Sequence, residues 1–183
     1  QISETYTKIE YIRLEKRGVG LALKESWGKS HANIIGYMDL DLATSLKHLK
    51  ETIDILQDED ADFVYGSRLH KNSKVEGRSL KREITSRIFN KVVRVYFNTK
   101  FSDGMCGFKF IKKAAYDRIS SRGANSDTWF FSTELLVVAE SLNIKTRELP
   151  IHWTDSSGSH VKILRLSLQY LRSMYLLKKK LNE

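Results

Sequence analysis

The stretch Ile34-Ile35-Gly36-Tyr37-Met38-Asp39-Leu40-Asp41-Leu42-Ala43-Thr44 is an apolar run that ends in two carboxylates. Because a single residue separates Asp39 from Asp41, oxygens of both side chains can reach one hard cation. In phosphate-handling enzymes Mg²⁺ or Mn²⁺ is commonly held by one or two carboxylates and completed by substrate phosphates. Ligands bind at the carboxyl ends of strands in open α/β sheets. The stretch therefore predicts a strand with a cation site at its end, with a plain cap for a helix starting near Ser45 as the alternative.

Apolar periodicity around this stretch predicts alternating strands and helices. Strands are expected over 8–14, 32–40, 62–66, 104–111 and 146–153, and the second of these reads as a central strand. Helices are expected over 20–30, 45–57, 80–97, 133–142 and 161–181. Strands that alternate with helices favour a layered α/β domain.

Composition limits the class of protein. With 183 residues, of which 41% are apolar, the chain is long enough for one domain with its own core. The single cysteine, Cys106, cannot form an internal disulfide, which favours a reducing compartment. Since no apolar run reaches the length of a membrane span, we do not expect this domain to cross a membrane.

Charge is distributed in blocks along the chain. Residues 39–62 hold eight acidic side chains against two lysines, whereas residues 68–100 hold ten basic side chains against two acids. Residues 160–183 add six basic side chains against one acid. Such basic blocks attract phosphates, nucleic acid or an acidic membrane surface, although they can also be solvated helix faces.

Five further motifs follow the two aspartates in order. They are Gly66-Ser67-Arg68, Leu80-Lys81-Arg82-Glu83-Ile84-Thr85-Ser86, Ser102-Asp103-Gly104-Met105-Cys106-Gly107-Phe108-Lys109, Trp129-Phe130-Phe131-Ser132-Thr133-Glu134 and Glu148-Leu149-Pro150-Ile151-His152-Trp153-Thr154-Asp155. Together the six pieces resemble family 2 glycosyltransferases, and among them the dolichyl-phosphate glucosyl- and mannosyltransferases and their prokaryotic relatives. The resemblance runs from about Arg13 to Val161.

This resemblance implies a GT-A fold, which is a Rossmann-like mixed sheet flanked by helices. It also implies a nucleotide-sugar donor of the UDP-glucose or GDP-mannose type, Mg²⁺ or Mn²⁺ on Asp39 and Asp41, and inversion at the anomeric carbon. The acceptor would be a dolichyl or undecaprenyl phosphate, and the enzyme would sit peripherally on an anionic membrane at its cytoplasmic face. Residues 1–160 would form a partial catalytic domain, and residues 161–183 an amphipathic basic helix.

The resemblance also implies roles for single residues. Catalytic roles fall on Asp41, Arg68, Arg82, Asp103 and Glu134. Binding of nucleotide, sugar or phosphate falls on Arg17, Gly18, Asp39, Ser86, Asp155, Ser159 and Lys162.

The chain departs from the family pattern in two places. The family's first strand, of the type Val-Ile-Pro-x-Tyr-Asn-Glu, and its Asp-Gly-Ser segment do not occur here, so the fold is expected to lack its first strand. Some members also carry a glutamine two residues after the second aspartate, where this chain has Ala43. We therefore expect the cation to depend more on water and substrate phosphate.

Three other functions remain open at this level. A family 2 enzyme that acts on a saccharide hydroxyl would need Asp103, Glu134 or Asp155 as a base. A basic nucleic-acid-binding module would use the basic block at 68–100 with its interleaved aromatics, but the motifs make nucleic acid the less favoured partner. A haloacid-type phosphatase also uses two aspartates after a strand, but Ala43 occupies the position where that motif requires Thr or Val.

Overall fold

The computed structural model describes residues 9–58, 60–155 and 163–183 of the 183-residue chain, with the backbone alone described for 163–168. The strands are β1 (Ile34–Met38), β2 (Phe63–Ser67), β3 (Lys74–Glu76), β4 (Phe108–Lys112), β5 (Thr146–Pro150) and β6 (His152–Thr154). The helices are α2 (Val19–Lys29), α3 (His48–Gln57), α4 (Leu80–Phe97), α5 (Lys113–Arg122), α6 (Phe131–Ser141) and α7 (Ile163–Asn182).

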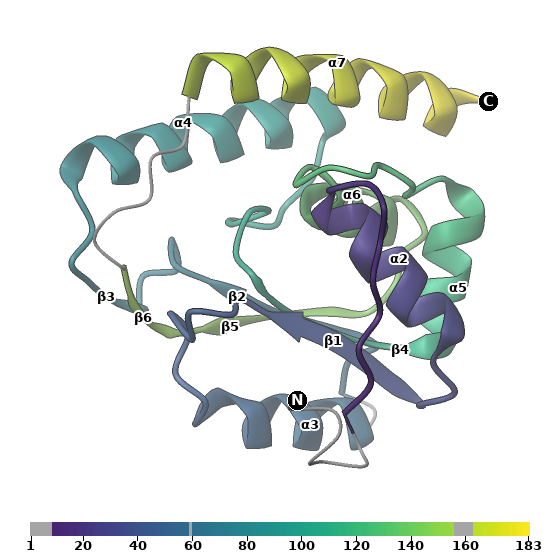
Figure 1. The fold of residues 1–183 in the computed structure, drawn as a ribbon. Coiled ribbons are helices and arrows are strands. Elements are labelled where there is room, and N and C mark those ends of the chain that lie inside the picture. The colour runs from purple at the N-terminus through teal and green to yellow at the C-terminus, as the bar shows by residue number, and fades with distance from the viewer. Residues whose placement is uncertain (1–8, 59, 156–162) are drawn as a thin grey trace.

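Four strands form a mixed sheet in the order β1-β4-β2-β5. β4 runs antiparallel to both of its neighbours, with Met38 opposite Phe108 and Tyr65 opposite Lys109, whereas β2 and β5 are parallel. β3 and β6 form a separate parallel pair. Helix α3 covers one face of the sheet, and α2, α5 and α6 lie on the other, with α4 and α7 beyond them (Figure 1). The predicted α/β fold, a mixed sheet flanked by helices, is confirmed.

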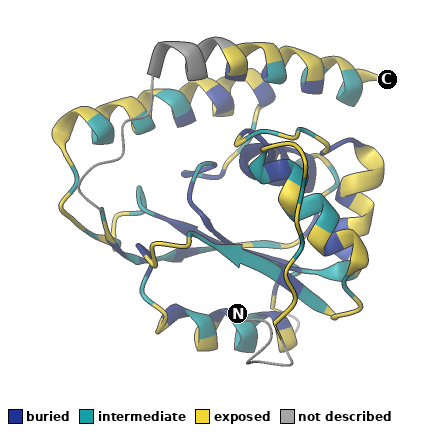
Figure 2. Cartoon of the chain, viewed as in Figure 1, coloured by how far each residue is buried: buried dark blue, intermediate teal, exposed yellow. Residues whose placement is uncertain are grey.

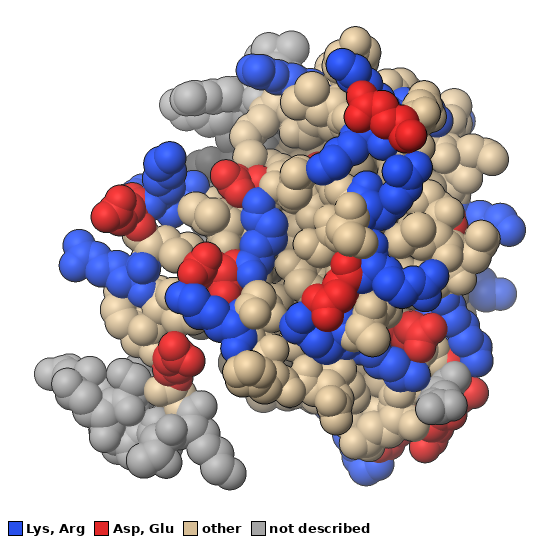
Figure 3. Space-filling view, turned by 90° about the vertical axis from the view of Figure 1, so that its right-hand side faces the viewer, with Lys and Arg blue, Asp and Glu red and all other residues tan. Residues whose placement is uncertain are grey.

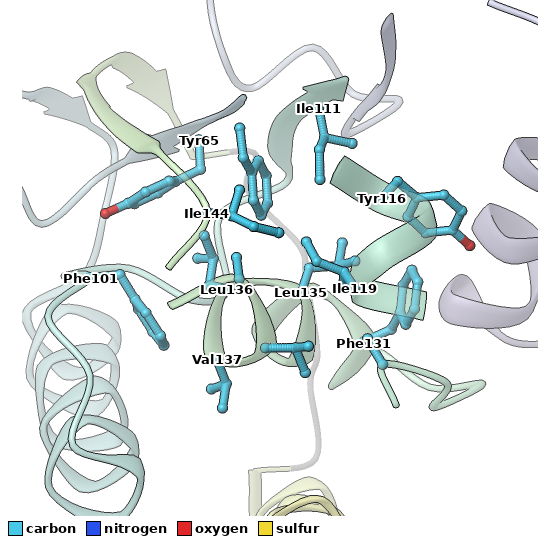
Figure 4. Close-up of a cluster of buried hydrophobic side chains, with 14 of the residues drawn as sticks. Tyr65, Phe101, Ile111, Tyr116, Ile119, Phe131, Leu135, Leu136, Val137 and Ile144 are labelled. Atoms are coloured by element: carbon cyan, nitrogen blue, oxygen red, sulfur yellow. The ribbon is translucent and has the colours of Figure 1, made fainter. Parts of the chain in front are cut away.

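Side chains alternate between two cores, as expected for strands covered on both faces. Phe63 and Tyr65 belong to the larger cluster, under α5 and α6, whereas Val64 between them belongs to the smaller cluster, under α3. Figure 4 shows the larger cluster, in which Leu135 and Leu136 of α6 lie against side chains of the sheet. This packing fixes the ends of β1, β2 and β4 relative to one another.

Helix α4 has the predicted bounds because its end signals are strong. The Ser79 hydroxyl accepts a hydrogen bond from the Arg82 backbone N–H at 3.4 Å, as an N-cap does. At the other end Asn98 takes a left-handed conformation with φ 57° and ψ 49°, which closes the helix. The helix therefore begins and ends at the predicted residues, and most of its positions are exposed or half-buried (Figure 2).

Several expected elements differ from those observed. Residues 9–14 have no regular structure and Tyr11 is 76% exposed, so the strand predicted there is wrong; no described strand lies beside this segment. β1 is an edge strand of the described sheet, where we expected a central one. Residues 104–107 form a turn before β4 rather than part of the strand, and α5 and β3 were not predicted. No helix in the described ranges has both the length and the apolar character needed to cross a bilayer.

Candidate functional site

The two aspartates lie in a tight turn that follows β1. The backbone N–H of Asp39 donates to the carbonyl of Gly107 at 2.9 Å, which continues the pairing of β1 with β4. The N–H of Leu42 then donates to the Asp39 carbonyl at 3.0 Å, with Leu42 at φ 53°. The N–H of Ala43 donates to Asp41 Oδ1 at 3.2 Å. A left-handed backbone is costly for a leucine, so the contacts around it must hold the turn that places Asp41 near Asp39.

Gly107 makes room for the carboxylate of Asp39. A Cβ atom at position 107 would lie 2.2 Å from each of its carboxylate oxygens. Burial raises the pKa of Asp39, and repulsion from the Asp41 carboxylate raises it further. A divalent cation placed between the two side chains would relieve that repulsion. The two carboxylates therefore fit Mg²⁺ or Mn²⁺.

The described residues supply few other ligands for such a cation. The described ranges contain no group of three or more His, Cys, Asp or Glu side chains that could hold a metal ion. Mg²⁺ in particular is often bound by one or two carboxylates together with water and substrate phosphates. The remaining ligands would therefore come from water and from a bound phosphate compound.

Arg68 and Asp103 form a buried ion pair at the end of β2. Arg68 donates from Nε to Asp103 Oδ2 at 2.7 Å, from Nη2 to Oδ1 at 2.9 Å, and from its backbone N–H to Oδ2 at 3.1 Å. The guanidinium also lies over the Trp153 ring, 4.9 Å from its centroid. Burial alone would raise the pKa of Asp103, but the Arg68 charge and hydrogen bonds outweigh it and hold the pKa at about 2. Arg68 is thereby fixed in orientation, and its charge lowers the pKa of Asp39.

A second group of polar side chains lies at the start of α4. Arg82 Nη1 donates to Asp155 Oδ2 at 3.0 Å, and Asp155 Oδ1 accepts from Trp153 Nε1 at 3.2 Å. Arg78 Nη2 donates to the Ser86 hydroxyl at 2.5 Å and to the Arg82 carbonyl at 3.4 Å. The structure thus brings Arg82, Ser86 and Asp155 into one polar group.

Arg78 is a site residue that the motifs did not single out. Its side chain is only 6% exposed, and its Nε lies 3.0 Å from Glu83 Oε2 without the alignment of a hydrogen bond. Burial lowers the pKa of Arg78, and the positive charge of Arg68 lowers it further, so the two guanidinium groups influence each other. The only sequence signal was an arginine placed directly before the helix N-cap. Arg78 thus contacts the α4 group directly, and its charge interacts with those of Arg68 and Asp103.

Lys109 is fully buried in β4, which is rare for a lysine. Its Nζ donates to the carbonyls of Gly104 and Cys106 at 3.2 and 2.6 Å and to the Ser132 hydroxyl at 2.8 Å. Burial lowers the pKa of Lys109 to about 8, although the nearby carboxylate of Asp103 acts in the opposite direction. Lys109 therefore fastens the turn between Asp103 and Gly107 to α6, and it was not predicted as a site residue although it lies in a quoted motif.

Glu134 is not brought to these groups. It lies in the first turn of α6, where its carboxylate accepts a hydrogen bond from the Ser126 backbone N–H at 2.8 Å. Burial raises the pKa of Glu134. The side chain lines a separate hollow of about 380 Å³ between the 123–126 loop and the C-terminal end of α7. In this conformation Glu134 holds the loop that precedes its helix.

Gly18, for which the resemblance implied a role in ligand binding, has a packing role in the structure. A Cβ atom at Gly18 would lie 2.2 Å from the carbonyl oxygen of Asp127, so only glycine allows α2 to approach this loop so closely. The Arg17 side chain is exposed. Ser159 and Lys162, which the resemblance placed at the site, lie outside the described residues.

An apolar hollow of about 230 Å³ opens beside Asp39. It lies between α2, the end of β1 and the start of α6, and Trp129 at its rim is 51% exposed. Its other lining residues are Val19, Ala22, Leu23, Tyr37, Met38 and Leu40. The hollow can accept an uncharged part of a ligand whose phosphates lie near Asp39 and Asp41.

Surface charge on the side of α5 and the C-terminal end of α7 is mixed. On this face Lys and Arg side chains are interspersed with Asp and Glu side chains (Figure 3). Nucleic-acid-binding surfaces gather cations on one face or along one helix. This side of the molecule therefore offers little support for the nucleic-acid alternative.

Comparison with known proteins finds relatives that are named as glycosyltransferases. It is similar to glycosyltransferase AglD of Haloferax volcanii, with 29% identity over 82% of this chain and 24% of that protein. It is also similar to the dolichyl-phosphate beta-glucosyltransferases of Dictyostelium discoideum, with 29% identity over 92% of this chain and 53% of the relative, and of Drosophila melanogaster, with 26% identity over 90% and 52%. The chain thus spans between about a quarter and about half of the length of these relatives.

A match to one family model covers most of the chain. The model of glycosyl transferase family 2 matches residues 1–120, a range that includes Asp39, Asp41, Arg68, Arg82 and Asp103. The mixed sheet flanked by helices agrees with this match. The chain belongs to glycosyl transferase family 2.

Proposed function

We propose that this chain is part of an inverting, metal-dependent enzyme that moves a hexose from a nucleotide-sugar to a polyprenyl phosphate. Relatives named dolichyl-phosphate beta-glucosyltransferase support the acceptor class and the type of sugar transfer. The pair Asp39 and Asp41 and the arginines near it support a donor with a diphosphate. The donor's base and sugar are left to the experiment below.

The contacts of the candidate bases decide which class of acceptor we propose. A sugar hydroxyl must lose a proton during attack and needs a carboxylate that can take it. Asp103 is fully buried against Arg68 with a pKa of about 2, so it is a very weak base. The Asp155 carboxylate contacts Arg82 and Trp153, and the Glu134 carboxylate contacts the 123–126 loop instead of this site. A phosphate monoester, with a second pKa of about 6, is already largely dianionic at neutral pH and needs no base.

The reaction would be a single displacement. An oxygen of the acceptor phosphate forms a bond to the anomeric carbon, the bond from that carbon to the nucleoside diphosphate breaks, and the configuration inverts. A cation on Asp39 and Asp41 would stabilise the charge that develops on the leaving diphosphate. Arg68, fixed by Asp103, adds positive charge on the same side.

The acceptor phosphate fits the first two turns of α4. Arg82 and Ser86 lie one turn apart on the inner side of this helix, close to Arg78. Asp155 holds the Arg82 side chain at 3.0 Å and so directs it. This arrangement supplies cations and a hydroxyl, which are what a dianionic phosphate needs.

The proposal is tested by calorimetric titration of the full-length protein with a panel of nucleotide-sugars, with and without Mn²⁺. One donor should bind in a metal-dependent manner, and Asp41→Asn should weaken that binding by at least about 100-fold, since a charge stabiliser of this kind contributes several kcal/mol. Asp54→Asn on α3, which removes an exposed carboxylate, is the matched control and should bind as the wild type does.

The absence of metal-dependent binding for every donor would overturn the proposal. The acceptor is tested separately by transfer assays with a polyprenyl phosphate and with a saccharide. Transfer to the saccharide alone would favour a hydroxyl acceptor. Salt-sensitive binding of nucleic acid that Asp39→Ala does not change, without donor binding, would favour the nucleic-acid module.

A further inference from the structure

Arg78 is a buried arginine that lies just before helix α4. Gly77 precedes it at φ 70°, and a Cβ atom on this glycine would lie 3.1 Å from the Asp155 carbonyl oxygen. The Asp155 backbone N–H also donates to the Glu76 carbonyl at 2.9 Å, so the chain passes close to the end of β6 before it enters the helix. The Arg78 side chain is only 6% exposed, which is rare for an arginine without a specific task or partner.

The guanidinium of Arg78 makes the Ser86 hydroxyl a hydrogen-bond acceptor. Arg78 Nη2 donates to Ser86 Oγ at 2.5 Å and to the Arg82 carbonyl at 3.4 Å. A guanidinium carries only donors, so the serine oxygen must be the acceptor in this bond. A hydroxyl has a single hydrogen, and this contact does not use it. The hydrogen of Ser86 therefore remains to be donated to another group.

A serine inside a helix often turns this hydrogen back to the carbonyl four residues earlier. Thr85, the neighbour of Ser86, does so, because its Oγ1 donates to the Lys81 carbonyl at 2.8 Å. For Ser86 the equivalent carbonyl is that of Arg82, which accepts from Arg78. Among the described residues, Arg78 is the only hydrogen-bond partner of Ser86 Oγ. Arg78 thus takes the place of the internal bond that would use up the hydroxyl hydrogen.

Glu83 holds the other edge of the Arg78 guanidinium. Its Oε2 lies 3.0 Å from Arg78 Nε, while its Oε1 contacts Arg87 at 2.7 Å. The carboxylate supplies a nearby counter-charge within the first turns of α4. Arg78 is therefore fixed in place by protein groups and does not depend on a ligand for its position.

Ser86 and Arg82 can be reached from solvent, whereas Arg78 is covered. The Arg82 side chain is 36% exposed and Ser86 is half-buried, against 6% for the side chain of Arg78. A ligand at the start of α4 would touch the two exposed groups, and Arg78 would act on it through Ser86. A charged donor also polarises the hydroxyl that accepts from it, which strengthens the bond that this hydroxyl donates onward.

We propose that Arg78 is a positioning residue that holds the Ser86 hydroxyl with its hydrogen available to an oxygen of the bound phosphate. This role rests on the proposed function, in which the acceptor phosphate lies at the first two turns of α4. The free oxygens of a dianionic phosphate monoester carry lone pairs and no hydrogen. They can therefore accept the bond that Ser86 is prepared to donate.

Steady-state kinetics of the full-length protein test this role, with a short, water-soluble polyprenyl phosphate as the acceptor. Ser86→Ala should lower kcat/KM for this acceptor by about 10-fold or more, because a hydrogen bond to a charged group is lost. Arg78→Met should cause a similar loss on its own, since Ser86 can then turn its hydrogen back to the Arg82 carbonyl. When Ser86→Ala is already present, Arg78→Met should lower kcat/KM by less than about 2-fold, because the two residues act as a unit.

The controls separate a positioning role from a general effect on the fold. The KM of the donor should stay at the wild-type value in all three variants. Thr85→Val is the matched control, because it removes the neighbouring hydroxyl, which is exposed and bonded within the helix. Transfer by this variant should proceed at the wild-type rate.

An equal loss from Arg78→Met with and without Ser86→Ala would overturn the inference, since Arg78 would then act on the phosphate directly or only through the fold. A raised donor KM in Arg78→Met would overturn it as well. So would an unchanged kcat/KM in Ser86→Ala, a variant that should fold because alanine favours helices. In each case the wild type still transfers the sugar and the proposed function stands. A wild type that transfers to no polyprenyl phosphate would sink the proposed function, and this inference with it.

Discussion

Asp103→Asn should destabilise the fold because it leaves the Arg68 guanidinium buried without its anion. In the wild type the two side chains are 11% and 0% exposed and are joined by two short hydrogen bonds. The pKa of Asp103 falls from 3.8 to about 2, which corresponds to about 2 kcal/mol at ~1.4 kcal/mol per pKa unit. Removing one partner of a buried pair commonly costs about 3–5 kcal/mol. We expect the free energy of unfolding to fall by about 3 kcal/mol.

Urea unfolding followed by circular dichroism measures this loss. Asp54→Asn is the control, because the Lys50–Asp54 pair is 86% and 48% exposed and should contribute less than about 0.5 kcal/mol. The difference in free energy of unfolding between the wild type and Asp103→Asn should also depend on pH. A carboxyl group with a lowered pKa stabilises the fold fully above the unfolded value of 3.8, and this stabilisation is lost as the pH falls through about 2.

A free energy of unfolding of Asp103→Asn within about 0.5 kcal/mol of the wild-type value at pH 7 would contradict this expectation. The pair would then contribute as little as a surface ion pair. A difference that stays constant between pH 5 and pH 2 would also contradict the assignment, because the loss would not come from the charge of Asp103.

Two further substitutions separate the site from the fold. Gly107→Ala should weaken Mn²⁺-dependent donor binding, because the new Cβ displaces the Asp39 carboxylate. Since that carboxylate can rotate away, the melting temperature should stay within a few degrees of the wild-type value. Unchanged donor binding in calorimetry would contradict this expectation. Lys109→Met should cost about 2 kcal/mol in urea unfolding, because it leaves buried acceptors without their donor. In the wild type, Lys109 should make the free energy of unfolding rise from pH 8 towards pH 10.5. Its pKa of about 8 in the folded protein lies below the unfolded value of 10.5, so the unfolded chain binds the proton more tightly. The same rise in the Lys109→Met variant would show that the buried amine is not its cause.

Local sequence signals were sufficient to predict an element where several of them occur together. Helix α4 was predicted with the observed bounds because apolar periodicity runs between an N-cap serine and a residue suited to a left-handed C-terminus. The strand before Asp39 was predicted for a similar reason, since a run of five apolar or small residues is followed directly by a polar one. The α/β class followed from the alternation of such segments.

Relations between distant residues could not be read from periodicity. Nothing local reveals that the partner of Arg68 is Asp103, 35 residues later, or that a glycine in the same motif supports Asp39. The edge position of β1 likewise depends on which strands pair, and pairing is a long-range choice. The amine of Lys109 is buried only because the turn before β4 and α6 close over it.

The position of β1 has a consequence for the dynamics of the cation site. Within the described sheet this strand is hydrogen-bonded to β4 alone, and edge elements open locally at a lower free energy than central ones. Asp39 follows its last residue and donates its backbone N–H to the Gly107 carbonyl, so each fraying event of β1 moves Asp39 away from Gly107. A ligand that holds both carboxylates should therefore slow amide hydrogen exchange along Ile34–Met38, which makes this strand a reporter of occupancy at the site.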